Sequence, residues 1–230
     1  RNGVTLGGGQ TFTGGVSSTV SSNTLTGNVS TVNSALTLGT TAVTGNTTLA
    51  AGNKTISLGA TTISDNITLI VGTGGTGNTE VASLVGVAGG TANAANATFN
   101  LAGTVELGGT VGTDFGTLTI TNSGGSIFQG AVGTNSDRVN SIVLTNTNGT
   151  VEFNGNLFAE SLSTGANNFS IAFDGDTSTF TNLVALTNTA NVRFGDDSGD
   201  TLTFTAGVTH TSGSSTSVSY THLRAHETFA

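Results

Sequence analysis

Residues 35–52 read ALTLGTTAVTGNTTLAAG, and residues 55–72 read TISLGATTISDNITLIVG. When the two stretches are aligned with Leu38 over Leu58, apolar residues coincide and seven positions are identical. The identical pairs are Leu38/Leu58, Gly39/Gly59, Thr41/Thr61, Asn46/Asn66, Thr48/Thr68, Leu49/Leu69 and Gly52/Gly72. Similarity at a fixed period of about 20 residues is typical of a solenoid, in which each repeat forms one coil.

The second half of the chain repeats more loosely, around one apolar anchor in each unit. It contains GTVELGG (103–109), GSIFQG (125–130), GTVEFNG (149–155), FSIAFDG (169–175) and NVRFGD (191–196). The anchors recur with a similar period, and they are Leu107, Phe128, Phe153, Phe173 and Phe194. We predict that these side chains, with Leu38 and Leu58, stack in the core of neighbouring coils.

Each unit contains two or three short runs in which apolar and polar residues alternate, such as TLTIT (117–121) and TLTFT (201–205). Alternate residues point to opposite faces of a strand, so these runs predict half-buried strands. Glycine, asparagine and aspartate separate the runs, as expected for tight turns. The chain has no proline, which fits strands that are hydrogen-bonded on both edges.

These patterns together predict an all-β fold, a parallel β-helix or β-solenoid with about 20–25 residues per coil. We expect one solenoid region over residues 1–217, with a looser Gly/Ala-rich coil or loop at 73–98. Coils at the ends of such a stack have open strand edges, and these predict end-to-end self-association of the isolated chain.

Composition excludes several functional classes. The 230 residues include 13 acidic and 5 basic side chains, which give a net charge of −8. So few cations cannot form a nucleic-acid-binding surface. Without cysteine the chain has neither disulfides nor cysteine-ligated metal sites. No stretch of about 18 apolar residues predicts a membrane span.

The C-terminal segment 218–230 differs from the rest of the chain. Residues 218–228 read VSYTHLRAHET and hold the single tyrosine and two of the three histidines. His222 and His226 have the spacing of a helical zinc-binding pair. We interpret the segment instead as a non-native tail, the translation of a sequencing adaptor. Because the chain starts at Arg1 and lacks methionine, we expect it to be an internal or processed fragment.

Acidic residues in the second half are candidate calcium ligands, because calcium takes oxygens from carboxylates and turn carbonyls. The candidates are Asp174, Asp176, Asp196, Asp197 and Asp200. Solvated acidic turns are the simpler interpretation, so we predict no bound metal.

The glycines at 72–77 match G-x-G-x-x-G, the pattern of dinucleotide-binding turns. No acidic residue lies about 20 residues further on, where the ribose contact is expected. We therefore predict a glycine-rich turn and no cofactor.

Two further patterns leave other functions open. Glu152 and Asp174 flank successive Phe anchors and would face outward on neighbouring coils, where a carboxylate pair can catalyse glycoside cleavage. Recurring Thr-x-Thr pairs, such as Thr117/Thr119 and Thr203/Thr205, would suit an ice-binding face if they formed a regular array. Thr is also a good strand former, which explains the pairs without a function.

Runs such as GTVEFNGNLFAESLSTGANNFSIAFDG (149–175) resemble the passenger regions of bacterial autotransporters and filamentous-haemagglutinin-like adhesins. The resemblance covers residues 1–217 and is one of composition and period. It implies a right-handed parallel β-helix in a protein that is secreted or displayed at the bacterial outer membrane. S-layer proteins share the acidic, cysteine-free, threonine-rich composition.

The leading hypothesis from the sequence is a non-enzymatic structural and interaction protein, a segment of a bacterial surface adhesin or stalk. Its expected location is extracellular or on the cell surface, and its expected partners are glycans or proteins of a host cell or matrix. The alternative functions are a polysaccharide lyase or hydrolase on the same scaffold, and an S-layer-like or ice-binding protein.

Overall fold

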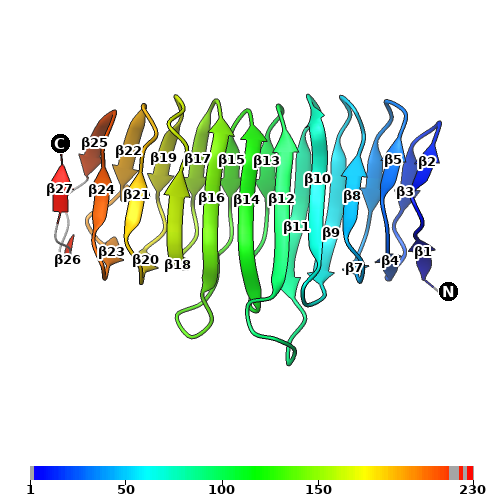
Figure 1. Ribbon diagram of the computed structural model, residues 1–230, viewed down its shortest axis with the longest axis horizontal. Coiled ribbons are helices and arrows are strands. Elements are labelled where there is room, and N and C mark those ends of the chain that lie inside the picture. Colours follow the sequence, from blue (N-terminus) through cyan, green and yellow to red (C-terminus); the bar gives the residue numbers. More distant parts are fainter. Residues whose placement is uncertain (1–2, 218–222, 225–226, 230) are drawn as a thin grey trace.

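The chain winds into a rod of stacked strands, with its first coil at one end and its last coil at the other (Figure 1). The computed structural model describes residues 3–217, 223–224 and 227–229. These residues form 27 strands and no helix, so the described part contains no helix that could cross a membrane. Neighbouring strands are parallel, which makes the molecule a β-solenoid of about 10 turns, as the repeats predict.

The coils contribute short strands or single bridges to three faces, which we number from the strand register. Face 1 consists of β3 (Val16–Ser18), β6 (Leu36–Leu38), the first parts of β9 (Ile56–Ile63) and β11 (Thr79–Gly86), β13 (Val105–Leu107), β15 (Ser126–Phe128), β17 (Thr150–Phe153), β19 (Ser170–Phe173), β22 (Asn191–Phe194) and β25 (Ser214–Ser217).

The second face adjoins face 1 along a corner of the rod. Face 2 consists of β1 (Val4–Leu6), β4 (Asn23–Leu25), β7 (Thr41–Val43), the second parts of β9 and β11, single bridges at Val111 and Val132, the first part of β18 (Leu157–Thr164), β20 (Thr177–Phe180), β23 (Thr201–Phe204) and β26 (Leu223–Arg224).

The third face has the longest strands. Face 3 consists of β2 (Gln10–Phe12), β5 (Val29–Thr31), β8 (Thr47–Ala50), β10 (Thr68–Gly75), β12 (Ala95–Leu101), β14 (Phe115–Ser123), β16 (Val139–Thr147), the second part of β18, β21 (Val184–Leu186), β24 (Val208–His210) and β27 (Glu227–Phe229). The described residues of the C-terminal tail thus continue the ladders of faces 2 and 3.

The strand register confirms most of the sequence alignment. Leu36 pairs with Ile56 and Leu38 with Leu58, as the alignment of the two repeats predicts. Each of the five second-half anchors pairs with the next one, from Leu107 to Phe194. Alternating burial explains this register, because only this register places the apolar side chains of every strand in the core and the polar side chains outside.

One part of the alignment is wrong by two positions. On face 3, Thr47, Thr48 and Leu49 pair with Leu69, Ile70 and Val71, so the identical pairs from 46 to 72 do not face each other. The cause is the corner at 64–67, where Asn66 has a left-handed backbone (φ 58°) and the Ile67 amide donates to the Ser64 carbonyl at 3.2 Å. This turn is longer than the corresponding corner of the preceding coil, and the difference shifts the register of face 3.

Coil length varies more widely than the repeats predict. Asn23 pairs with Thr41 across a short coil, whereas Leu69 pairs with Ala97 across a coil that is longer by about half. The longest coil includes the loop 87–94, which connects β11 to β12. This loop is the irregular part of the segment 73–98, most of which forms β10, β11 and β12.

A stack of aromatic rings fills the core of the second half. The ring centroids of Phe128 and Phe153 are 4.7 Å apart, those of Phe153 and Phe173 5.7 Å, and those of Phe173 and Phe194 5.8 Å. All four rings are buried, and interplanar angles of 8–10° make them parallel. A second pair, Phe180 and Phe204, stacks at 5.2 Å. The predicted core positions, including Leu38 and Leu58, are therefore confirmed.

Asparagine side chains link successive coils at the corners. In five places an asparagine Oδ1 accepts the backbone N–H of a threonine in the next coil, at 2.8–3.0 Å. The pairs are Asn28 with Thr48, Asn46 with Thr68, Asn78 with Thr104, Asn96 with Thr117 and Asn156 with Thr177. Each of these bonds satisfies a backbone amide at or near the start of a strand.

Candidate functional site

Charged side chains gather in one outward row on face 1. Successive coils place Glu80, Glu106, Ile127, Glu152 and then Ala172 at the same register position, followed by Arg193. Apart from Ala172, which is buried, these residues direct their side chains to the outside, because each lies between two buried neighbours of its strand. This row is the main concentration of ionisable groups on the sheet faces.

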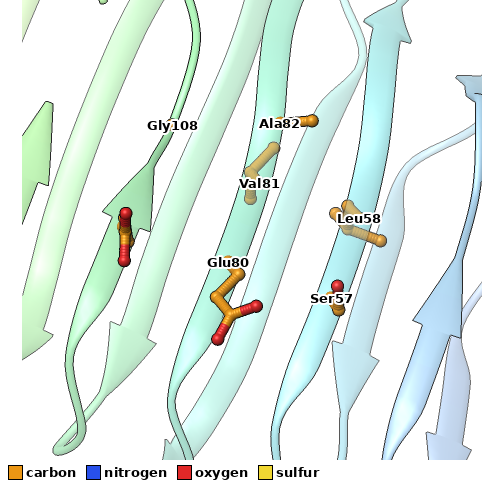
Figure 2. A pocket seen from close by; sticks show the side chains of 7 residues that line it. Ser57, Leu58, Glu80, Val81, Ala82 and Gly108 are labelled. Atoms are coloured by element: carbon orange, nitrogen blue, oxygen red, sulfur yellow. The ribbon is translucent and has the colours of Figure 1, made fainter. Parts of the chain in front are cut away.

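Glu80 and Glu106 lie beside a depression with a volume of about 280 Å³, lined by Ser57, Leu58, Glu80, Val81, Ala82, Glu106 and Gly108. Figure 2 shows Glu80, Val81 and Ala82 in succession along β11, with Ser57 and Leu58 on the adjacent β9. The depression exists because the next outward positions on these strands, Ala82 and Gly108, carry little or no side chain.

The two glutamates are direct register partners on neighbouring parallel strands. Such strands lie about 4.8 Å apart. Glutamate side chains on strands with this spacing can bring their carboxyl groups to the separation of about 5–5.5 Å that retaining glycosidases use. Sequence reasoning missed this pair, although TEV (79–81), VEL (105–107) and VEF (151–153) share a signal, a glutamate between two strand residues that recurs from coil to coil.

The pair expected from the sequence, Glu152 and Asp174, has a different arrangement. Glu152 faces outward as predicted, but Asp174 lies beyond the end of β19 and its side chain is only 12% exposed. The guanidinium Nη2 of Arg193 donates to Asp174 Oδ2 at 2.6 Å. Asp174 is therefore held in an ion pair.

The pKa of Asp174 is raised above its ordinary value of 3.8. Burial of the carboxyl group is the main cause, and Arg193 opposes it. The neighbouring carboxylates of Asp196, Glu152 and Asp200 raise the pKa further. Its other oxygen, Oδ1, is buried and has no hydrogen-bond partner in the described structure.

Three of the five candidate calcium ligands form a cluster. Oxygens of Asp196, Asp197 and Asp200 lie within 4.8 Å of one another, whereas Asp176 is not part of the group. The buried Asp200 accepts the backbone N–H groups of Asp196 (2.7 Å) and Asp197 (3.2 Å). Asp200 thus stabilises the turn between β22 and β23, which gives its carboxylate a role in the fold.

The other sequence candidates lie apart from the glutamate pair. Residues 72–75 form the end of strand β10 (Thr68–Gly75), so the predicted glycine-rich turn is wrong for them. The chain then leads into strand β11 and not into a helix, so the motif lacks the helix N-terminus of a dinucleotide site. His210 is buried, with Nδ1 2.7 Å from Ser215 Oγ and Nε2 3.3 Å from the Asn188 carbonyl oxygen. His222 and His226, which the sequence analysis assigned to a non-native tail, lie outside the described residues.

The Thr-x-Thr pairs do not align into one array. Thr117 and Thr119 lie on face 3, whereas Thr203 lies on face 2. On face 3 the row that contains Thr119 continues with Val143 and Ser163.

Comparison of the chain with protein-family models, with curated proteins and with solved structures returned no match. Interpretation of the candidate sites therefore depends on the geometry described above.

Proposed function

We propose that this chain is a structural and interaction segment of a bacterial surface-exposed or secreted adhesin or stalk. The observation that supports this proposal is the continuity of all three faces through about 10 turns. At about 4.8 Å per coil, such a stack is about 50 Å long. A rod of this kind holds whatever is attached to its ends at a fixed distance.

The packing supports a role as a stiff spacer. Each coil contacts its two neighbours through three hydrogen-bonded ladders and a shared apolar core, with the phenylalanine stack along it. Outward positions carry mostly threonine, serine and asparagine, whose short side chains are suited to contacts with glycans or proteins outside the cell. The absence of cysteine fits an extracellular location.

A display experiment tests the stalk. The chain is placed between a cell-surface anchor and a small binding module, and capture of large ligand-coated beads is measured. A rigid rod should give greater capture than a Gly/Ser linker of about 80 residues, which has a similar mean end-to-end distance of about 50 Å but also adopts many shorter distances. Equal capture with the two spacers would contradict the stalk.

Two variants sharpen this experiment. Phe153→Ala weakens the core and should reduce capture, whereas Thr37→Ser changes an outward side chain of face 1 and should leave it unchanged. Direct binding of the purified chain to glycan and matrix-protein arrays then separates an adhesin, which binds, from a plain stalk.

The second candidate function, a carbohydrate-active enzyme, rests on the Glu80–Glu106 pair beside its depression. Release of reducing ends is measured on a panel of polysaccharides. Glu80→Gln and Glu106→Gln should each abolish an activity of this site, and Glu152→Gln, two coils from Glu106 in the same row, should not. Activity that survives both glutamine variants would exclude this pair as the catalytic carboxylates.

A further inference from the structure

Face 3 carries a broad area without charge. The outward side chains of its central strands are short and neutral in each coil: Thr68 and Ile70 on β10, Asn96, Thr98 and Asn100 on β12, Thr117, Thr119 and Thr121 on β14, Ser141, Val143 and Thr145 on β16, and Ser161 and Ser163 on β18. The strands lie side by side in Figure 1. We call this surface the neutral face.

The charges of the molecule lie elsewhere. Glu80, Glu106, Glu152 and Arg193 occupy the outward row of face 1. Other charges sit at corners, including Glu160, where β18 bends from face 2 into face 3. With a net charge of −8, two copies of the chain repel each other through most orientations. Face 2 also has uncharged outward residues, such as Thr24, Thr62 and Thr179, but its strands are short and two of its positions are single bridges. The neutral face is therefore the broader surface through which two copies can meet without placing like charges opposite each other.

The side chains of the neutral face suit packing against a flat partner. Thr98, Thr119 and Val143 are register partners in one row, and each is β-branched. Such side chains have few rotamers, so little conformational entropy is lost when they are covered. The rows hold no aromatic ring on which a sugar could stack and no charged group that could bind an ion.

The neutral face continues from β5 to β24, because the outward residues Ser30, Thr48, Ala185 and Thr209 are uncharged as well, and its size matches that of a stable dimer interface. Among the described residues, nine strands of face 3, from β5 to β24, have parallel neighbours on both edges. At about 4.8 Å per coil and a strand length of about 17 Å, they cover roughly 700 Å². Standard interfaces bury about 800 Å² on each partner.

We propose that two copies of this chain pack side by side through their neutral faces. The two sheets lie about 10 Å apart with their strands aligned to within about 30°, the usual geometry of face-to-face sheets. The contact is self-complementary, so it closes as a symmetric pair. This proposal is independent of the function proposed above.

Sedimentation velocity over a concentration series tests the pairing. The wild-type chain should form a dimer whose dissociation constant changes little with salt, because the contact is uncharged. Thr119→Glu and Thr119→Lys each place a charge in the middle of the neutral face and should weaken the dimer by about tenfold or more. An equimolar mixture of the two variants should restore dimers.

Matched controls carry the same changes on face 1. Thr37→Glu and Thr37→Lys replace an outward threonine that has a parallel neighbour on each side, and they should leave the dimer intact. A strictly monomeric wild type overturns the proposal, and so does a dimer that the Thr119 variants do not weaken. A wild-type chain that stays monomeric and inhibits the growth of ice crystals also overturns the proposal, because the neutral face would then bind ice.

Discussion

Glycines make close contacts between coils at the corner between faces 1 and 2. A Cβ added to Gly155 would lie 2.5 Å from the carbonyl carbon of Gly130, and one added to Gly130 would lie equally close to that of Gly109. The backbones of successive coils approach so closely here that no side chain fits between them. This contact explains why Phe-x-Gly recurs at FQG (128–130), FNG (153–155) and FDG (173–175).

Gly155→Ala should therefore lower the free energy of unfolding by about 1–3 kcal/mol, the usual cost of overpacking. Thermal and urea unfolding measure this change. Gly14→Ala is the matched control, because a Cβ at Gly14 meets nothing within 4 Å. Equal effects of the two substitutions would show that the corner can relax.

A pH dependence follows from the raised pKa of Asp174. The folded state binds this proton more tightly than the unfolded state, whose pKa is near the ordinary 3.8. The contribution to stability is complete below pH 3.8 and is lost as the pH rises through the higher folded pKa. Asp174→Asn should therefore gain stability relative to wild type as the pH rises from about 4 to 7.

Melting temperatures over this pH range test the prediction for Asp174. Arg193→Gln removes the cation that opposes the shift, so it should steepen the loss of stability with pH. If the difference between wild type and Asp174→Asn does not vary with pH, the carboxyl group has no raised pKa.

At the scale of the strand, the phenylalanine stack links elements that are distant in sequence. The Phe153 ring lies between those of Phe128 and Phe173, and all three are buried. Phe153→Ala should cost about 3–5 kcal/mol of unfolding free energy, because the surrounding coils cannot collapse into the cavity. Phe153→Leu is the control and should retain most of the stability. A loss below about 1 kcal/mol would show that the stack relaxes around the gap.

The corner asparagines fix where one strand starts relative to the strand below it. The Oδ1 of Asn156 accepts the N–H of Thr177 at 3.0 Å, at the start of β20. Asn156→Ala should cost about 0.5–1.5 kcal/mol, whereas Asn156→Asp keeps an acceptor and should cost less. Amide exchange at Thr177 measures the effect locally. Unchanged exchange in Asn156→Ala would mean that water replaces the side chain at no cost.

Strand pairing was predictable from the sequence wherever alternation and identity agree. The anchors from Leu107 to Phe194 are apolar and recur with a similar period, so a single register buries them all. The offset between β8 and β10 was not predictable, because Thr47, Thr48 and Thr68 suit either side of a strand. Only the backbone of the 64–67 corner decides between the two registers.

The pairing of Glu80 with Glu106 was not predictable from the sequence for a different reason. The separation of Glu80 and Glu106 along the chain exceeds the period of the first half, because the coil that contains them includes the loop 87–94. Their distance in space depends on the strand register, whereas their distance in sequence depends on loop length. The sequence therefore predicted the scaffold and the outward direction of Glu152 but not which acids become neighbours.

At the scale of the whole molecule, the ends of the stack should be less stable than its middle. In the described structure β1, β2 and β3 each pair along one edge, whereas β12, β14 and β16 pair along both. Phe12 and Val16 in the first coil are only partly buried. Amide exchange should therefore be faster in β1–β3 than in β12–β16 by about tenfold or more.

The same open edges should allow end-to-end association, which the pairing through the neutral face leaves free. Light scattering of Thr119→Glu, in which side-by-side pairing is blocked, isolates this second mode. If the backbone amides of the first coil were as well protected from exchange as those of the central coils, the ends would not be less stable. If the protein also stayed monomeric at all concentrations, the ends would not associate.

Coil length varies along the chain, short between Asn23 and Thr41 and long between Leu69 and Ala97, while the strands keep their spacing. This tolerance bears on how the number of repeats can change during evolution. Gain or loss of one whole repeat leaves every other coil with an equivalent neighbour, since each coil contacts only the two beside it. Recombination between the similar segments 35–52 and 55–72 would change the rod by one coil, about 4.8 Å. Length can thus evolve in discrete steps, without redesign of the core.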